Sequence, residues 1–328
     1  MFRIRSFIMP AILAFILLAG SLIILFITQP SPEKAIKVTA VIKAIANDQE
    51  FWEVIKTGMR AAANEFGITL DIQGPWVESD VDGQIRITEN ILKNDPPTAL
   101  ILAAADYIRL APLVEQAVSQ GIRVIAMDSG VASSRLVTFV TTNNIEGGEK
   151  VAAEMLRILE PGRKLAIINH VQGTTTAMER EEGARKVLAQ DGRYPLLGVW
   201  FTENFEENAY AITVNLLKEY PDLGGILAMN EFSTLGTARA LQDQGHAGKV
   251  RLVGFDSSLT EIQLIEQGVI AATVIQKPFN MGYLAVRAAR DAAANRPLPP
   301  FIDTGSVLIT ADNLYEPENQ KLLFPFVD

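Results

Sequence analysis

The chain has 328 residues, 48% of them hydrophobic, which is enough for two domains with ordinary cores. It has no cysteine, which excludes disulfides, a thiolate metal site and a cysteine nucleophile. Its net charge of −9 argues against a nucleic-acid partner, which needs clustered Lys and Arg. His170 and His246 lie far apart in the sequence and lack zinc-motif spacing, so we predict neither a metal nor another cofactor.

Residues 1–30 form a segment of their own. Phe7–Ile27 carries no charge, and at about 1.5 Å per residue it spans a hydrocarbon core of about 30 Å. Arg3 and Arg5 precede it, so the positive-inside rule places everything after Pro30 outside the cytoplasm. A cleaved signal peptide is the competing interpretation, but its apolar region is usually about 7–15 residues and ends at a small-x-small site. The longer run here favours an uncleaved anchor.

From Ile36 onward, apolar strands alternate with amphipathic helices. The first half predicts strands at 36–42, 68–72, 98–103, 122–127 and 137–140, and helices at 51–66, 83–92 and 108–120. The second half predicts helices at 144–159, 175–190, 206–219, 233–244, 259–267 and 279–294, and strands at 165–169, 196–201, 225–229, 250–255, 271–276 and 306–309, before an irregular tail. This alternation indicates parallel sheets with helices on both faces.

Two predicted strands, far apart in the sequence, end in the same way. Val124-Ile-Ala-Met-Asp128 and Val250-Arg-Leu-Val-Gly-Phe-Asp256 each place an Asp-Ser pair after an apolar run. Open α/β sheets bind ligands just outside the carboxyl ends of their strands, so we expect both carboxylates to face one cleft. The alternative is that each Asp caps the helix that follows it.

The sequence contains no strong signal for catalysis. It has neither a G-x-G-x-x-G fingerprint after a strand nor a Walker loop or a nucleophile elbow. Asp128 and Asp256 could form an acid/base pair, but the sequence does not define their separation. We therefore expect a binding protein and not an enzyme.

Polar and aromatic residues gather where strands end and helices begin. Phe51 and Trp52 are adjacent on a helix, so we expect at least one of them to leave the core face. Arg180 lies in a charge run that is solvated in the simpler interpretation, and Asn230 and Gln276 suit either a helix cap or a ligand contact. Fixed donors and acceptors beside aromatic faces suit a small, neutral, polyhydroxylated ligand.

From Ile36 onward the chain resembles the periplasmic sugar-binding proteins of the ribose-binding type, relatives of the ligand-binding half of lac-type repressors. The ordered motifs that carry this resemblance are Asp48-Gln-Glu-Phe-Trp-Glu-Val-Ile-Lys-Thr-Gly58, Val124-Ile-Ala-Met-Asp128, Asn144-Ile-Glu-Gly-Gly148, Gly173-Thr-Thr-Thr-Ala-Met-Glu-Arg-Glu-Glu-Gly183, Tyr220-Pro-Asp222, Ala228-Met-Asn230, Val253-Gly-Phe-Asp256 and Ala271-Ala-Thr-Val-Ile-Gln276. The resemblance implies two similar doubly wound parallel-sheet lobes joined by a multi-strand hinge, here after one N-terminal transmembrane helix. That helix replaces a DNA-binding headpiece, so the repressor branch is not expected.

The resemblance also implies a set of ligand-binding residues, namely Gln49, Phe51, Trp52, Asp128, Arg180, Phe205, Asn230, Asp256 and Gln276. Phe51 and Trp52 would stack on the sugar, while Asp128 and Arg180 would bind its hydroxyls. At Phe205 the alignment is uncertain by one residue, with Asn204 as its neighbour.

One departure from the ribose-binding pattern concerns specificity. The ribose proteins follow the first hinge Asp with an Arg, and this chain has Ser129 there. The loss of a long bidentate donor argues against ribose as the ligand. By the same resemblance, the hinge crossings lie near residues 143, 276–277 and 303–304. The lobes would then comprise residues 36–143 plus 277–304 and residues 144–276 plus 305–328.

Three functions follow from these observations. The first is extracytoplasmic binding of a small neutral sugar or polyol, by hinge closure, for delivery to an ABC importer. The second is a membrane-tethered sugar sensor that signals to a histidine kinase or another membrane partner, which an uncleaved anchor favours. The third, a hydrolase using the Asp pair, would turn over a bound sugar.

Overall fold

The protein is described by a computed structural model, which covers residues 36–46 and 50–324. The chain divides into Met1–Ala35 and Ile36–Asp328, and only the second unit is described here. The predicted anchor Phe7–Ile27 and the predicted site residue Gln49 both lie outside the described residues. Over 36–46 and 50–324, no helix has the length and apolar character that a bilayer crossing requires.

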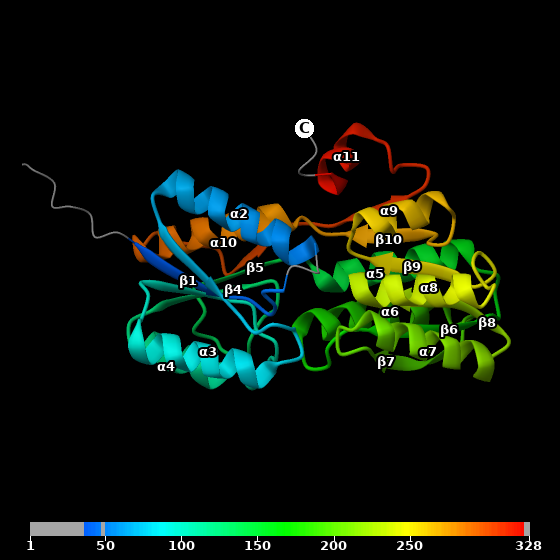
Figure 1. Ribbon diagram of the computed structural model, residues 1–328, viewed down its shortest axis with the longest axis horizontal. Coiled ribbons are helices and arrows are strands. Elements are labelled where there is room, and N and C mark those ends of the chain that lie inside the picture. The colour runs from blue at the N-terminus through cyan, green and yellow to red at the C-terminus, as the bar shows by residue number, and fades with distance from the viewer. Residues whose placement is uncertain (1–35, 47–49, 325–328) are drawn as a thin grey trace, which may run out of the picture. The chain divides into compact units, whose positions relative to one another are not determined.

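The first of two six-stranded sheets in the described residues is wholly parallel. Its strands, in spatial order, are β11 (Phe301–Asp303), β5 (Thr138–Thr141), β4 (Arg123–Met127), β3 (Ala99–Leu102), β1 (Lys37–Val41) and β2 (Thr69–Gln73). Helices α2 (Glu50–Phe66) and α10 (Pro278–Ala293) cover one face, and α3 (Val81–Asn94) and α4 (Ala111–Ser119) cover the other (Figure 1). We call this sheet and its helices the first lobe.

The core of the first lobe follows the period-two alternation of its strands. In β3, Ala99 and Ile101 pack toward α2 and α10, while Leu100 and Leu102 pack toward α3 and α4. All four side chains are fully buried. A strand buried on both faces reads as a continuous apolar run, as this one does in the sequence.

The second sheet forms the second lobe. Its strands, in spatial order, are β12 (Val307–Thr310), β10 (Ala272–Ile275), β9 (Arg251–Phe255), β8 (Leu223–Ala228), β6 (Lys164–Asn169) and β7 (Leu196–Phe201). They are parallel except for β12, which runs antiparallel to β10. One face packs on α5 (Asn144–Ile158) and α6 (Thr175–Asp191), and the other on α7 (Glu206–Glu219), α8 (Glu231–Asp243), α9 (Leu259–Glu266) and α11 (Pro317–Leu323).

The predicted α/β architecture of two parallel-sheet lobes is confirmed. Two elements escaped prediction. β11 follows a proline-rich loop and pairs with β5, and α11 lies in the tail that was expected to be irregular. Helix α11 begins with Pro317 at its first position, where the missing N–H costs nothing.

The described chain passes between the two sheets three times: from β5 to α5, from β10 to α10, and from β11 to β12. Two of the crossings are hydrogen-bonded to each other. The Asn143 amide donates to the Asp303 carboxylate at 3.1 Å, and the hydroxyls of Thr142 and Thr304 lie 3.3 Å apart. The lobes are thus connected by neighbouring strands and not by a single linker.

Candidate functional site

Asp128 and Asp256 leave their strands in the same way. Both have a positive φ, 59° for Asp128 and 77° for Asp256, which is uncommon for residues other than glycine and which Asp tolerates better than most. The Asp128 amide donates to the Val140 carbonyl at 3.0 Å, and the Asp256 amide donates to the Val274 carbonyl at 2.9 Å. The two lobes therefore present one buried carboxylate each from equivalent positions.

The alternative that these aspartates cap the following helices is wrong. After Asp128 the next regular element is β5, and after Asp256 the N-cap of α9 is Ser258, whose hydroxyl accepts from the Glu261 amide at 3.2 Å. Asp256 instead accepts from the amide of Glu231, the first residue of α8, at 3.2 Å. The peptide dipoles at this helix start favour a negative charge there.

In the first lobe, a buried lysine faces Asp128. Lys43 lies just beyond β1, and its Nζ is 2.9 Å from Asp128 Oδ2 and 3.7 Å from Glu78 Oε2. It also donates to Ser129 Oγ at 3.2 Å. Burial by itself lowers the pKa of the Lys43 ammonium, but Asp128 and Glu78 outweigh burial and hold the pKa above its ordinary value. The ammonium therefore stays charged at neutral pH.

Glu78 connects this ion pair to the first helix. Its Oε1 accepts from Trp52 Nε1 at 2.7 Å, and the Trp52 ring centroid lies 5.7 Å from Lys43 Nζ, within cation–π range. Burial raises the pKa of Glu78, against the opposing charge of Lys43. Trp52 is fully buried and Phe51 nearly so, and their rings meet edge to face at 5.2 Å. Both are part of the core of the first lobe, where one was expected to leave it.

In the second lobe, Arg180 is buried and not solvated. Its Nε donates to Asn144 Oδ1 at 2.9 Å, and its Nη1 donates to the Met229 carbonyl at 2.7 Å and lies 4.0 Å from Asp256 Oδ2. The guanidinium carbon sits 3.7 Å from the centroid of the Phe255 ring. Burial lowers the pKa of Arg180, and Asp256 opposes that shift.

Amide side chains continue this network. Gln276 Nε2 donates to Asp256 Oδ1 at 2.6 Å. Asn230 is the N-cap of α8, accepting from the Ser233 amide at 3.1 Å, while its Nδ2 donates to Asn204 Oδ1 at 2.6 Å. Asn230 is thus a cap and a member of the buried polar cluster at the same time.

The two sets of residues face each other across the junction of the lobes. The Gly130 amide of the first lobe donates to Thr175 Oγ1 of the second at 2.8 Å, and Ser129 Oγ lies 3.4 Å from Thr176 Oγ1. The negative charge of Asp128 is near enough to contribute to the raised pKa of Asp256, whose main cause is burial. The expectation of one shared site is in keeping with this geometry.

The structure brings together most of the residues expected from the sequence, namely Phe51, Trp52, Asp128, Arg180, Asn230, Asp256 and Gln276. Phe205 lies at the start of α7 with its side chain 43% exposed, and its expected ligand contact stays a prediction. Its neighbour Asn204 is buried and contacts Asn230.

Lys43 and Glu78 were missed by the reasoning from sequence. Both follow strands of the first sheet, Lys43 after β1 and Glu78 in the loop after β2. The strand-end rule that found the two aspartates applies to them equally. His170, which follows β6, is also buried, and its Nε2 lies 2.9 Å from Thr176 Oγ1. Burial holds the pKa of His170 well below its usual range, so the ring is neutral.

Comparison with known proteins gives concordant matches. The family model described as a periplasmic binding protein domain matches residues 40–297. The D-ribose/D-allose-binding protein of Pseudomonas aeruginosa is 29% identical over 268 residues, which cover 79% of this chain and 82% of that protein.

Two solved structures extend the comparison. The periplasmic component of an ABC-type sugar transport system from Hahella chejuensis is 31% identical, with a TM-score of 0.80, covering 84% of this chain and 99% of that one. An ABC transporter solute-binding protein from Agrobacterium vitis with bound D-fucose is 27% identical, with a TM-score of 0.84, covering 88% of this chain and 99% of that one.

Proposed function

Because the chain belongs to the periplasmic binding protein domain family, a non-enzymatic solute-binding class, we propose that it binds a small neutral sugar or polyol between its lobes and supplies it to an ABC importer. The observation that carries the proposal is the buried set of donors and acceptors shared between the lobes. Lys43 and Asp128 contribute from one side, and Arg180 and Asp256 from the other. Hydroxyl groups both donate and accept, so a polyol can pair with all four.

The charge balance of the site supports a neutral ligand. Two buried cations, Lys43 and Arg180, face three buried carboxyl groups, those of Glu78, Asp128 and Asp256. The cations already have anionic or carbonyl partners within the protein. An anionic ligand would add an uncompensated buried charge, which is strongly unfavourable.

The site also has a replacement for the donor that is missing at Ser129. The Lys43 ammonium lies 3.2 Å from Ser129 Oγ, close to the place where a longer residue at 129 would begin. Lys43 thus offers a compact charged donor in place of the planar fork of an arginine. Because the two groups differ in geometry, we propose that the preferred sugar is not ribose.

We test the function by a thermal-shift screen over pentoses, hexoses and polyols, since a ligand that binds only the folded protein raises its melting temperature. Titration calorimetry then compares Asp128→Ala and Asp256→Ala with Asp222→Ala, an exposed control whose carboxylate pairs with Lys164. Loss of a buried acceptor costs about 1–3 kcal/mol, or roughly 5- to 150-fold in Kd. Unchanged affinity in both site variants would place the site elsewhere.

The proposed ligand-driven change is closure of one lobe on the other. The lobes would comprise residues 36–143 plus 277–304 and residues 144–276 plus 305–328, and would move about the three crossings. A ligand favours closure only through contacts it makes in the closed form and not in the open one. Small-angle scattering with the best ligand from the screen should show a smaller radius of gyration, and an identical value at saturation would contradict closure.

We further propose that Phe7–Ile27 is retained as an anchor in the cytoplasmic membrane, with the binding unit outside. Its uncharged length after Arg3 and Arg5 supports this proposal. A retained anchor also favours the second function, a sensor that presents its closed form to a histidine kinase. Mass spectrometry of the native protein should find Phe7–Ile27 present, whereas a chain that begins near Ser31 would rule the anchor out.

A further inference from the structure

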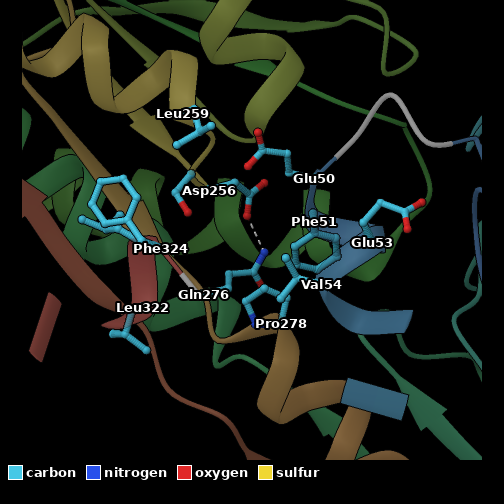
Figure 2. Close-up of a pocket in the computed structure, with 12 residues that line it drawn as sticks. Glu50, Phe51, Glu53, Val54, Asp256, Leu259, Gln276, Pro278, Leu322 and Phe324 are labelled. Atoms are coloured by element: carbon cyan, nitrogen blue, oxygen red, sulfur yellow. Dashed lines mark hydrogen bonds between the residues drawn. The ribbon is translucent and has the colours of Figure 1, made fainter. Parts of the chain in front are cut away.

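A cavity of about 280 Å³ lies at one edge of the junction between the lobes (Figure 2). Its opposite walls come from different lobes. Phe51 and Val54 of α2 form one wall, and Leu322 and Phe324 at the end of α11 form the other. Leu259, at the start of α9, lies above them in this view. The cavity is smaller than most pockets for whole ligands, which measure about 300–1,000 Å³.

The cavity adjoins the candidate sugar site. Asp256 and Gln276 belong to the site and also line the cavity, and the hydrogen bond between them is drawn in Figure 2. Asp256 Oδ2 is the oxygen that points toward Arg180 and the interior of the site. A ligand held there therefore has the cavity directly beside it.

One polar atom at this boundary lacks a partner. Gln276 is only 5% exposed, and its Oε1 has no hydrogen-bond partner among the described residues, because its Nε2 is the atom that donates to Asp256. A buried acceptor left unpaired costs free energy. A hydroxyl or N–H group of a ligand at this place would give Gln276 Oε1 a hydrogen-bond donor.

The charges of the cavity exclude an anion. The ionisable residues that line it are Glu50, Glu53 and Asp256, with no lysine, arginine or histidine among the lining residues. Glu53 forms an ion pair with Lys56, and Asp256 lies 4.0 Å from Arg180, while Glu50 adds a further carboxylate to this wall.

From these contacts, and resting on the proposed function, we propose that the cavity is a subsite for the apolar, uncharged substituent of a glycoside. The sugar lies between the lobes on Asp256, with one hydroxyl donating to Gln276 Oε1. The substituent packs against Phe51, Leu259 and Phe324. Because the walls belong to different lobes, the substituent adds contacts that exist only when the lobes are together, and the glycoside binds more tightly than the free sugar.

The first experiment probes the cavity with benzyl alcohol, using saturation-transfer difference NMR on the full chain. We expect millimolar binding that weakens at least about tenfold in Leu259→Glu, which places a carboxylate beside Asp256. Leu259 is 53% exposed, so the substitution leaves the fold intact, and Ile108→Glu at a 65% exposed position of the first lobe is the matched control. Equal binding by all three proteins, or binding only after removal of residues 325–328, would overturn the proposal.

The second experiment separates the subsite from the proposed function. Titration calorimetry compares D-glucose, D-galactose and D-xylose with their phenyl β-glycosides. A glycoside that binds at least tenfold more tightly than its sugar, with the gain lost in Leu259→Glu, supports the subsite. Free sugars that bind while every glycoside binds more weakly would overturn the subsite and leave the sugar-binding function standing. If neither class binds but benzyl alcohol does, both the function and the glycoside subsite are wrong.

Discussion

Asp128 and Asp256 share a backbone conformation and a hydrogen-bonding frame, but their surroundings differ in charge. At the first strand end, Asp128 pairs directly with Lys43 at 2.9 Å. At the second, the nearest cation is Arg180 at 4.0 Å, and its hydrogen bonds go to Asn144 and to a backbone carbonyl.

The second strand end is rich in acids. Burial raises the pKa of Asp256, and it raises the pKa of Glu261 well above its ordinary value, with the charges of Glu231 and Asp256 adding to the effect. The same backbone geometry therefore holds two carboxyl groups, Asp128 and Asp256, whose neighbouring charges differ. The first is compensated by the protein, whereas the second gains more from the hydroxyl donors of a ligand.

The substitution with the largest expected effect removes Lys43, the cation that compensates Asp128. Lys43→Met leaves Asp128 and Glu78 buried without their cation, so we expect the free energy of unfolding to fall by about 3–5 kcal/mol. Urea unfolding measures this change. The control is Lys37→Met, at the start of β1, whose pairing with Asp95 is partly exposed and worth less than about 1 kcal/mol. Equal losses in the two variants would show that the buried pair has no special role.

The next test exchanges each aspartate for its amide. Asp256→Asn should lie within about 1 kcal/mol of the wild type at pH 7, because a rotated Gln276 amide can offer its unpaired Oε1 to the new N–H. Asp128→Asn should lose about 1–3 kcal/mol, because Lys43 then keeps the Ser129 hydroxyl and, as its one carboxylate partner among the described residues, Glu78 at 3.7 Å. Urea unfolding compares the variants side by side, and the reverse order of stabilities would refute the distinction between the two ends.

The smallest effect concerns pH. The pKa of Glu261 is higher in the folded protein than in the unfolded chain, so its contribution to stability is full below the unfolded pKa and is lost as pH rises through the folded pKa. Between the unfolded and the folded pKa of Glu261, the free energy of unfolding falls by about 1.4 kcal/mol per pH unit. Glu261→Gln removes this fall, so we expect the variant to be more stable than the wild type at pH 7 by more than about 1 kcal/mol.

Near pH 4 the two proteins should differ by less than about 0.5 kcal/mol, because the carboxyl is then largely protonated in both states of the wild type. Unfolding at pH 4, 5.5 and 7 follows the trend, with the exposed Glu89→Gln as the control. A constant difference across the three pH values would show that Glu261 does not titrate as described.

Sequence reasoning found the sheets and the two aspartates because both are encoded locally. Continuous apolar runs mark strands buried on two faces, and a carboxylate directly after such a run marks a strand end. It missed Lys43 because a lysine after a strand is usually solvated, and burial here depends on Asp128 and Glu78, which come from other strands. Pairings of this kind are set by the tertiary structure alone.

Short elements escaped for a similar reason. β11 has three residues and exists because β5 offers it a partner, and α11 has seven residues and packs on the core of the second lobe through Leu323. Neither element is long enough for its sequence to show a helical or strand-like hydrophobic period. For Arg180, the charged neighbours in the sequence suggested a solvated side chain. In the structure it is buried, because its guanidinium donates to Asn144 and to the Met229 carbonyl.

The order of the crossings bears on how the chain is made. The five parallel strands of the second lobe are continuous in sequence, from Lys164 to Ile275, whereas the first lobe requires α10 and β11 from near the end of the chain. Until α10 emerges, the face of α2 that carries Ile55, Gly58 and Met59 has no helix to cover it. The first lobe therefore begins first but stays incomplete until after the five parallel strands of the second lobe have been made, and during synthesis its exposed apolar face is where a chaperone would be needed.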